Sequence, residues 1–374
     1  MVFVFHVNLL DVGWMGVWLF FVISGFAVTS SLLGSVAESS WQQIRNFYAR
    51  RALRIWPLYF SYIVLIYVGL FPWSKNPSFG NLPYLASFTY NFRMAFTVSG
   101  DDIGWYLGHL WTLSVEEQFY LLLPMALVFL SRRNLELLLM AIIILCPLAR
   151  WRLGIFYQMD GVYFFGPDHF DAFAVGVLIA LYRPVFENQY KYARPAMFVA
   201  ASAFVLYCAV YLTVGVAMHG ISPEAAKNII RVRIVGQGRE IFLYIMMYVV
   251  SGALIIRVLT KKPSLFFRVA QNKYVQGVGI ISYGVYMFHP AVLHVIYTIL
   301  GWDTPHKVVI ARLIVLTLAF PIVLCAASLS FRYLEQPFLK LRKKFASRLA
   351  PPNSVGGSDL GSKLINSLGT TMRS

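Results

Sequence analysis

Charged residues are scarce in this sequence of 374 residues, where Asp, Glu, Lys and Arg together make up only 13%. A soluble domain usually has about a quarter of its residues charged. Hydrophobic residues make up 59% of the chain, and a soluble protein of this length would have to expose many of them to water. The composition therefore excludes an ordinary soluble enzyme and a disordered protein, and it indicates a polytopic membrane protein.

Acidic residues and cysteines are also few. The 16 Asp and Glu residues stand against 32 Lys and Arg, which gives a formal net charge of +16. Such an excess can indicate nucleic-acid binding, but no basic and aromatic platform is present, and membrane proteins carry Lys and Arg in cytoplasmic loops. We therefore expect no nucleic-acid partner. The three cysteines have no C-x-x-C spacing, which argues against a disulfide framework and a zinc site, and we expect no metal: Cys146, Cys208 and Cys325.

Long apolar runs predict an all-α membrane bundle of about ten spans. Met1–Leu10 is too short to cross a bilayer, which takes about 20 apolar residues, and it lacks the features of a signal peptide. We expect it to be the second half of a first helix that is truncated at its N-terminus. Nine full spans are expected at Val12–Leu33, Ile55–Pro72, Leu110–Leu130, Leu135–Ala149, Phe164–Leu181, Ala196–Met218, Ile241–Ile256, Val278–Leu300 and Val308–Phe331.

The distribution of basic residues predicts the orientation of these spans. If the connection between the second and third spans is cytoplasmic, the cytoplasmic loops carry more than twice as many Lys and Arg residues as the opposite loops. This bias supports the span count, and it puts the C-terminus in the cytoplasm. We expect residues 1–345 to form one transmembrane domain. Residues 346–374, rich in Gly, Ser and Pro, should form a disordered cytoplasmic tail.

His6 is the first candidate for chemistry. An ionisable side chain inside a span costs about 2.5–3.5 kcal/mol on insertion scales, so each one needs a reason. His6 lies in the apolar segment Phe-Val-Phe-His-Val-Asn. A membrane-embedded imidazole titrates near neutral pH and can act as a general base. The alternative is a histidine near a helix end that faces interfacial water.

Arg51 and Arg54 form a second candidate group, at the cytoplasmic mouth of the third expected span. Residues three apart on a helix share a face. Two guanidinium groups on one face suit bidentate phosphate binding. The alternative is an ordinary positive-inside anchor, with Trp56 at the membrane interface.

Glu116 and Glu117 lie in the segment Trp-Thr-Leu-Ser-Val-Glu-Glu-Gln-Phe-Tyr. Ser114 and Glu117 have the spacing of a capping box, so one acid can serve to open a helix. Adjacent side chains on a helix point in different directions, so capping does not explain both acids. The other interpretation is a carboxylate that orients a histidine or pairs with a buried arginine.

Two further segments contain polar candidates near apolar helices. Ser24 precedes Gly25, and glycine within a span usually permits close helix packing. Asp171 follows Asp168 and His169 at the start of the sixth expected span, where it can cap the helix or line a polar pocket. The spacing of these three residues is not diagnostic of a metal site.

The C-terminal part contributes three more candidates. Tyr283 and His289 precede Pro290, which would kink a helix at that point, and kinks within spans often accompany polar cavities. Glu335 is three residues after Arg332, a spacing that suits a surface ion pair.

Taken in order, these segments resemble the acyltransferase 3 family of integral membrane O-acyltransferases, which acetylate bacterial cell-surface sugars. The family usually has an arginine eleven residues before the first histidine, which has no counterpart here, and Trp18 stands where many members have an acidic residue. The matching pieces are Phe5-His6, Gly16-Val17 with Leu19-Phe20-Phe21-Val22-Ile23-Ser24-Gly25-Phe26, Arg50-Arg51-x-x-Arg54-Ile55-x-Pro57-x-Tyr59, Leu110-Trp111-Thr112-Leu113-x-x-Glu116-Glu117-Gln118-Phe119-Tyr120, Phe170-Asp171-Ala172-Phe173-x-x-Gly176, Ile281-Ser282-Tyr283-x-x-Tyr286-x-x-His289 and Glu335-x-Pro337-Phe338.

The resemblance implies transfer of an acyl group, most often acetyl, from cytoplasmic acyl-CoA to a hydroxyl of a glycan or lipid-linked sugar, with no tightly bound cofactor. It implies that His6 is catalytic and that Arg51 and Arg54 are needed for activity. We expect these arginines to hold the phosphates of acyl-CoA and His6 to act as general base, although an acyl-histidine intermediate is an alternative. Glu116 and Glu117 are the acidic catalytic candidates, and Glu116 would orient or charge-balance the site.

A transporter or flippase is the alternative from another functional class. Its intramembrane His and Glu residues would relay protons or ions, and it would move solute without consuming acyl-CoA. The absence of an internal repeat weakens this interpretation. A purely structural membrane protein is a third alternative, although it gives no reason for His6 and two adjacent glutamates.

Overall fold

The computed structural model describes residues 1–10, 12–34, 39–70, 79–96, 105–156, 160–187, 189–230, 237–261, 265–302 and 308–342. All regular secondary structure within these ranges is helical, which confirms the all-α prediction. The expected C-terminal tail, residues 346–374, lies outside the described residues.

Seven of the described helices are long and apolar enough to cross a bilayer. They are α2 (Gly16–Leu33), α3 (Ser40–Leu65), α7 (Trp111–Phe129), α8 (Arg132–Trp151), α11 (Ala193–His219), α13 (Arg239–Leu259) and α17 (Val309–Ser330). Helices α15 (Lys273–Ile280) and α16 (Ser282–Ile299) form an eighth span if the pair is taken together, with a bend of 66° between them. The bend falls at Ile281, before the position expected from Pro290, which lies inside α16.

The expected count of ten spans is not confirmed. Helix α9 (Phe170–Leu181) has 12 residues and is therefore about 18 Å long, well short of a hydrocarbon core of about 30 Å. Helix α1 (Val2–His6) has only 5 residues. The apolar runs at these positions belong to short helices buried among longer ones, and hydropathy alone does not separate the two cases.

Helix α3 begins well before the span expected at Ile55–Pro72. Ser39 caps it, because the Ser39 hydroxyl accepts a hydrogen bond from the Gln42 backbone N–H at 3.2 Å. Arg51 and Arg54 therefore lie within α3, and their place at the cytoplasmic mouth of the span stays a prediction.

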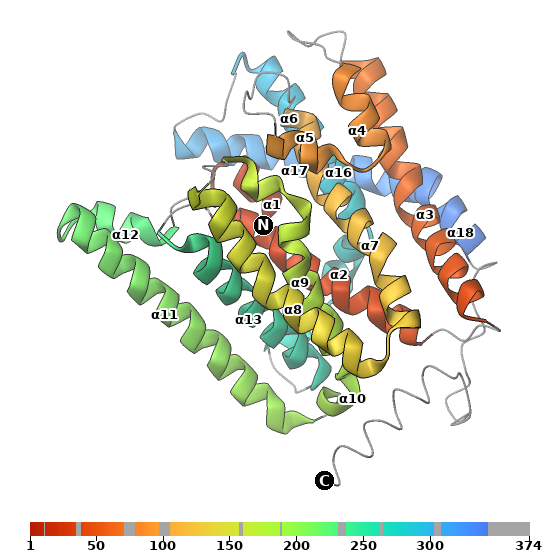
Figure 1. Cartoon of the computed structure of the whole chain (residues 1–374). Helices are drawn as coiled ribbons and strands as arrows, with labels where there is room; N and C mark the ends of the chain where they lie inside the picture. The colour runs from red at the N-terminus through yellow and green to blue at the C-terminus, as the bar shows by residue number, and fades with distance from the viewer. Residues whose placement is uncertain are drawn as a thin grey trace.

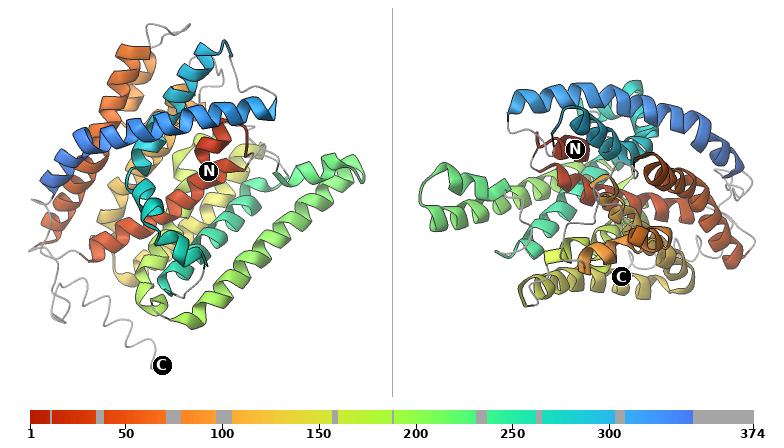
Figure 2. Two further views of the ribbon diagram at one scale, coloured as in Figure 1. Left: turned by 180° about the vertical axis from the view of Figure 1, so that it is seen from behind. Right: turned by 90° about the horizontal axis from the view of Figure 1, so that it is seen from above.

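The helices surround a central α2, which packs against α9, α7 and α13 (Figure 1). Helix α11 runs along α13 at one edge of the molecule, and α12 (Pro223–Ile230) folds back against it. At the opposite edge α3 packs against α18 (Gln336–Arg342). Helix α17 crosses the rear of the bundle over α16 and lies close to the N-terminal helix, as Figure 2 shows. The other short helices are α4 (Leu82–Ala86), α5 (Tyr90–Phe96), α6 (Trp105–Gly108), α10 (Arg183–Phe186) and α14 (Leu265–Ala270).

Helix α1 is held against α16 and α17 by a small apolar cluster of its own. Phe3 and Val7 are buried there against Leu293 of α16 and Ala319 of α17. His6 lies between these two anchors on the same short helix. The cluster therefore fixes the position of the His6 backbone although α1 makes little more than one helical turn.

Glycines allow α2 and α9 to approach closely. A Cβ atom added at Gly176 would lie 2.0 Å from the Val22 carbonyl oxygen, and one added at Gly25 would lie 2.2 Å from the Phe173 carbonyl oxygen. Beside this contact the rings of Phe21 and Phe173 stack at 4.6 Å. The prediction that Gly25 serves close helix packing is confirmed, and α9 supplies the matching glycine.

Gly176→Ala is expected to destabilise the protein, because the new methyl group meets backbone that cannot move aside without separating α2 from α9. Overpacking of this kind costs about 1–3 kcal/mol, occasionally more. The measurement is the midpoint of thermal unfolding of the purified protein in detergent. Gly277→Ala is the matched control, because a Cβ atom at Gly277 of α15 has no neighbour within 4 Å. Equal midpoints for the two variants would contradict the packing argument.

Candidate functional site

A cavity of about 330 Å³ lies between α1, the start of α2, the start of α7 and α16. This volume is within the range of small-molecule sites, about 300–1,000 Å³. Apolar and aromatic side chains form most of its wall. The residues with polar side-chain atoms that line it are His6, Trp14, His109, Trp111, Thr112, Tyr163 and Tyr286.

His6 and His289 meet at the edge of this cavity. His6 Nδ1 lies 2.8 Å from His289 Nε2, and His289 Nδ1 lies 2.7 Å from the Tyr286 carbonyl oxygen. The planes of the two imidazole rings differ by 12°. The structure therefore brings together two of the candidates from opposite ends of the sequence.

Two other cavity residues, His109 and Trp14, have buried polar groups that lack a hydrogen-bond partner among the described residues. Within the part of the chain that the structure describes, the two ring nitrogens of His109 and the indole N–H of Trp14 have no hydrogen-bond partner. The His109 ring also packs against His289, with ring centroids 5.6 Å apart. Buried polar groups are normally hydrogen-bonded, and unpaired ones are costly. Their position on a cavity wall indicates groups that a ligand would satisfy.

Thr112 connects the cavity to a polar face of α7. Its hydroxyl lies 2.6 Å from the Tyr286 hydroxyl, which donates to the His109 carbonyl oxygen at 2.7 Å. Glu116 and Tyr120 follow Thr112 at intervals of one turn, on the same face of the helix. The distance along α7 from Thr112 to Tyr120 is about 12 Å.

Glu116 belongs to a buried cluster with Ser24 and Tyr120. The Ser24 hydroxyl donates to Glu116 Oε1 at 2.7 Å. The Tyr120 hydroxyl donates to the same carboxylate, and its oxygen lies 3.0 Å from Ser24 Oγ. Glu117 points elsewhere and accepts a hydrogen bond from the Trp56 indole N–H at 3.2 Å. The cluster thus joins two of the candidates, Ser24 and Glu116, one turn away from the histidine cavity.

The capping-box interpretation of Ser114 and Glu117 is wrong. Helix α7 begins at Trp111, so both residues lie inside it. Its N-cap residue is Leu110, whose side chain makes no capping hydrogen bond. The Ser114 hydroxyl instead donates to the Leu110 carbonyl oxygen, at 3.4 Å.

Arg51 and Arg54 retain their hydrogen-bond donors. The Arg51 guanidinium stacks over the Tyr120 ring, 4.3 Å from its centroid. The N–H groups of a guanidinium lie in its own plane, so stacking leaves them able to donate hydrogen bonds. Arg54 is exposed on the next turn of α3. Among the residues that the structure describes, neither arginine forms a salt bridge.

Two of the C-terminal candidates lie outside the cavity. The Tyr283 hydroxyl donates to the Ile55 carbonyl oxygen at 2.9 Å and so ties α16 to α3. Glu335 is buried and accepts a hydrogen bond from the Ser330 hydroxyl at 3.3 Å. The surface ion pair with Arg332 is not formed within the described residues.

Asp171 forms a buried ion pair with Arg150, in which Arg150 Nη2 lies 2.6 Å from Asp171 Oδ2. The Tyr248 hydroxyl joins both charges, with Arg150 donating to it at 2.8 Å. Arg150 also donates to the backbone carbonyls of Asp168 and Glu240. This network joins α8, α9 and α13, and it assigns Asp171 a structural role in place of the polar pocket considered from the sequence.

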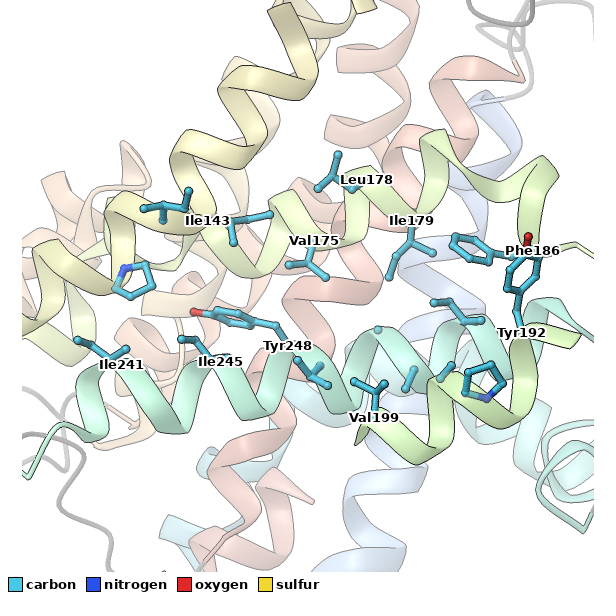
Figure 3. A pocket seen from close by; sticks show the side chains of 18 of the residues that line it. Ile143, Val175, Leu178, Ile179, Phe186, Tyr192, Val199, Ile241, Ile245 and Tyr248 are labelled. Atoms are coloured by element: carbon cyan, nitrogen blue, oxygen red, sulfur yellow. The ribbon is translucent and has the colours of Figure 1, made fainter. Parts of the chain in front are cut away.

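A second, larger hollow in the described structure is lined almost entirely by apolar side chains. It is an apolar groove of about 810 Å³ between α8, α9, α11 and α13, lined by residues such as Ile143, Val175, Ile179 and Tyr192 (Figure 3). The Tyr248 hydroxyl on its wall is already engaged by Arg150 and Asp171. The smaller histidine cavity is therefore the better candidate for a reaction site.

The sequence interpretation missed His109, Trp14 and Arg150 as site or network residues. His109 lies next to the Leu-Trp-Thr-Leu motif, so an intramembrane histidine there was a visible signal. Arg150 directly follows the expected span Leu135–Ala149, whereas in the structure it lies in α8 with 1% of its surface exposed. Nothing in the local sequence distinguishes Trp14 from an ordinary aromatic residue.

The chain is similar in sequence to bacterial proteins that are named O-acetyltransferases. It is 25% identical over 350 residues to the peptidoglycan O-acetyltransferase OatA of Listeria monocytogenes, a match of 88% of this chain and 51% of that protein. It is 24% identical over 361 residues to the O-acetyltransferase OatA of Staphylococcus aureus, a match of 91% of this chain and 55% of that protein. The chain thus spans about half the length of these curated relatives. No solved structure matches it at a significant level.

The model of the family described as an acyltransferase domain matches residues 2–331. This range includes His6, Arg51 and Arg54 of α3, the polar face of α7 and His289, and it confirms the resemblance inferred from the motifs. The chain therefore belongs to the acyltransferase 3 family.

Proposed function

We propose that this chain is a membrane O-acyltransferase that moves an acetyl group from acetyl-CoA to a hydroxyl of a cell-envelope carbohydrate. The observation that carries the proposal is a cavity lined by His6, His109 and Thr112, at whose edge His6 contacts His289, inside a domain of the acyltransferase 3 family. The name of the Listeria monocytogenes relative, a peptidoglycan O-acetyltransferase, supports a glycan acceptor. The bacterial plasma membrane is the corresponding location.

Arg51 and Arg54 would bind the phosphates of acetyl-CoA. Arg51 stacks on Tyr120, and Tyr120 lies about 12 Å along α7 from Thr112 at the cavity. In acetyl-CoA the extended pantetheine arm separates the phosphates from the thioester. A donor whose phosphates are held near Tyr120 can therefore present its thioester at the cavity, along the polar face that Thr112 and Glu116 form.

The two substrates would approach from opposite ends of α7. Helix α7 is followed by Arg132 and Arg133, the kind of basic pair that marks a cytoplasmic loop, whereas the cavity lies at its other end, around Trp111 and Thr112. The donor would enter from the cytoplasm and the carbohydrate from the outer side. The same orientation puts the C-terminus in the cytoplasm.

His6 would act as the general base. The acceptor oxygen forms a bond to the acetyl carbonyl carbon, the carbon–sulfur bond breaks, and the hydroxyl proton passes to His6. His6 then returns this proton to the thiolate of coenzyme A, so that the enzyme ends as it began. General-base assistance of this kind contributes typically 10²–10⁴-fold.

Trp14 and His109 would bind the acetyl carbonyl oxygen. The indole N–H of Trp14 can only donate, and it is buried on the cavity wall with no acceptor among the described residues. A tetrahedral intermediate places negative charge on that oxygen, and donors already in position stabilise it without reorganisation. Glu116, held by Ser24 and Tyr120, would balance the positive charge of Arg51.

His6→Ala is expected to lower the deposition of acetyl groups by about 10²–10⁴-fold, because the base is removed. The measurement is alkali-labile acetate on the cell-envelope glycans of a deletion strain complemented with each variant, together with acetyl-CoA consumption by membranes of the same cells. His219→Ala, at the exposed C-terminus of α11, is the matched control. Full acetylation with His6→Ala would reject the mechanism, and solute movement without acetyl-CoA consumption would favour a transporter.

Arg51→Gln and Arg54→Gln are expected to raise KM for acetyl-CoA about tenfold or more with little change in kcat, because each loses charge-assisted hydrogen bonds to phosphate. Initial rates against acetyl-CoA concentration provide the measurement. Arg45→Gln, an exposed arginine earlier on α3, is the control for the loss of a positive charge. An equal rise of KM in all three variants would indicate a non-specific electrostatic effect.

Trp14→Phe is expected to lower kcat by about 10²–10³-fold, the usual cost of removing one donor to an oxyanion, and to leave KM for acetyl-CoA nearly unchanged. Trp18→Phe is the control, because Trp18 packs edge-on against Trp14 at 5.1 Å but does not line the cavity. If both variants lose activity in proportion to their thermal stability, the effect of Trp14 is one of packing.

A further inference from the structure

We propose that His289 is a positioning residue that holds His6 in the tautomer with its lone pair on Nε2. The proposal rests on the assignment of His6 as the base, and it names the group that makes His6 competent. It follows from the order of hydrogen bonds between Tyr286, His289 and His6.

The Tyr286 carbonyl oxygen determines which nitrogen donates and which accepts in the chain of hydrogen bonds from Tyr286 through His289 to His6. A backbone carbonyl oxygen only accepts, so the contact of 2.7 Å with His289 Nδ1 requires a proton on that nitrogen. A neutral imidazole carries one proton, which leaves His289 Nε2 with a lone pair. His6 Nδ1 lies 2.8 Å from this Nε2 and must be the donor. The remaining ring nitrogen of His6, Nε2, therefore bears the lone pair.

The alternative, a cationic His289 that donates from both nitrogens, is disfavoured by its surroundings. The His289 side chain has 1% of its surface exposed. The rings of Phe3 and His109 lie against it, with centroids 5.8 and 5.6 Å from that of His289, and no acidic side chain is within salt-bridge distance of it among the described residues. An unpaired charge in such a site is costly. His289 is therefore more stable in its neutral form, in which Nδ1 donates to Tyr286 and Nε2 accepts from His6.

This arrangement has the logic of a base oriented by a third group. When His6 Nε2 takes the hydroxyl proton of the acceptor, the ring becomes an imidazolium, and its Nδ1–H donates to His289 Nε2. His289 thereby stabilises the charge that appears during the reaction. It also prevents the other tautomer of His6, in which Nε2 would carry a proton and could not accept one.

The test compares His289→Gln with His289→Phe. The Gln side chain can accept a hydrogen bond from His6 Nδ1–H with its carbonyl oxygen, near the position that His289 Nε2 occupies, whereas Phe fills the space without an acceptor. We expect His289→Phe to lower kcat by about 10²-fold or more with KM for acetyl-CoA within twofold of wild type, and we expect His289→Gln to retain at least a tenth of wild-type kcat. Initial rates are measured with the full chain in lipid nanodiscs, with the thermal unfolding midpoint recorded for each variant.

His294→Phe on the same helix is the control, since His294 lies against Tyr106 rather than His6. Wild-type kcat in His289→Phe, with His6→Ala inactive, would overturn the positioning role and leave the acyltransferase assignment intact. Equal losses in the Gln and Phe variants, at wild-type stability, would also overturn it, because the acceptor would not matter. Normal acetyl transfer by His6→Ala would reject the proposed mechanism itself.

Discussion

A buried ion pair between Arg150 and Asp171 fixes the centre of the bundle on which the site depends. Both charges are removed from solvent, which is tolerable only because they neutralise each other and their remaining polar atoms are hydrogen-bonded. The pair sets α9 against α8, while Tyr248 attaches both to α13. Helix α9 in turn meets α2 through Gly176, and α2 begins beside the turn whose Trp14 forms part of the cavity wall.

The cavity and the polar face of α7 form one continuous set of groups. Thr112 stands at the cavity, Glu116 one turn away, and Tyr120 a further turn away beneath Arg51. Polar groups in an apolar bundle are expensive unless they are paired or serve a ligand. Here the hydrogen-bonded groups around Glu116 hold helices together. The indole N–H of Trp14 and the ring nitrogens of His109, which have no hydrogen-bond partner among the described residues, lie on the cavity wall.

Several features of this protein followed from the sequence. Apolar runs without β patterning predicted an all-helical membrane protein, and the motifs from His6 to Glu335 predicted the acyltransferase 3 family. The span count did not follow, because a buried helix of 12 residues such as α9 is as apolar as a spanning one. The start of α3 was also misplaced, since the cap at Ser39 precedes a polar first half that hydropathy does not recognise as part of a span.

Residue types and their spacing determined which groups are available: the first-helix histidine, a pair of arginines, adjacent glutamates and a distant His289. Only the tertiary structure decided how they combine, because contacts such as that between His6 and His289 depend on how α1 packs against α16. Packing likewise leaves the ring nitrogens of His109 at the cavity without a hydrogen-bond partner among the described residues, whereas it pairs Asp171 with Arg150. Sequence spacing carries information within one helix, where geometry is periodic. Between helices the partner of a buried group is set by side-chain packing, which no local pattern records.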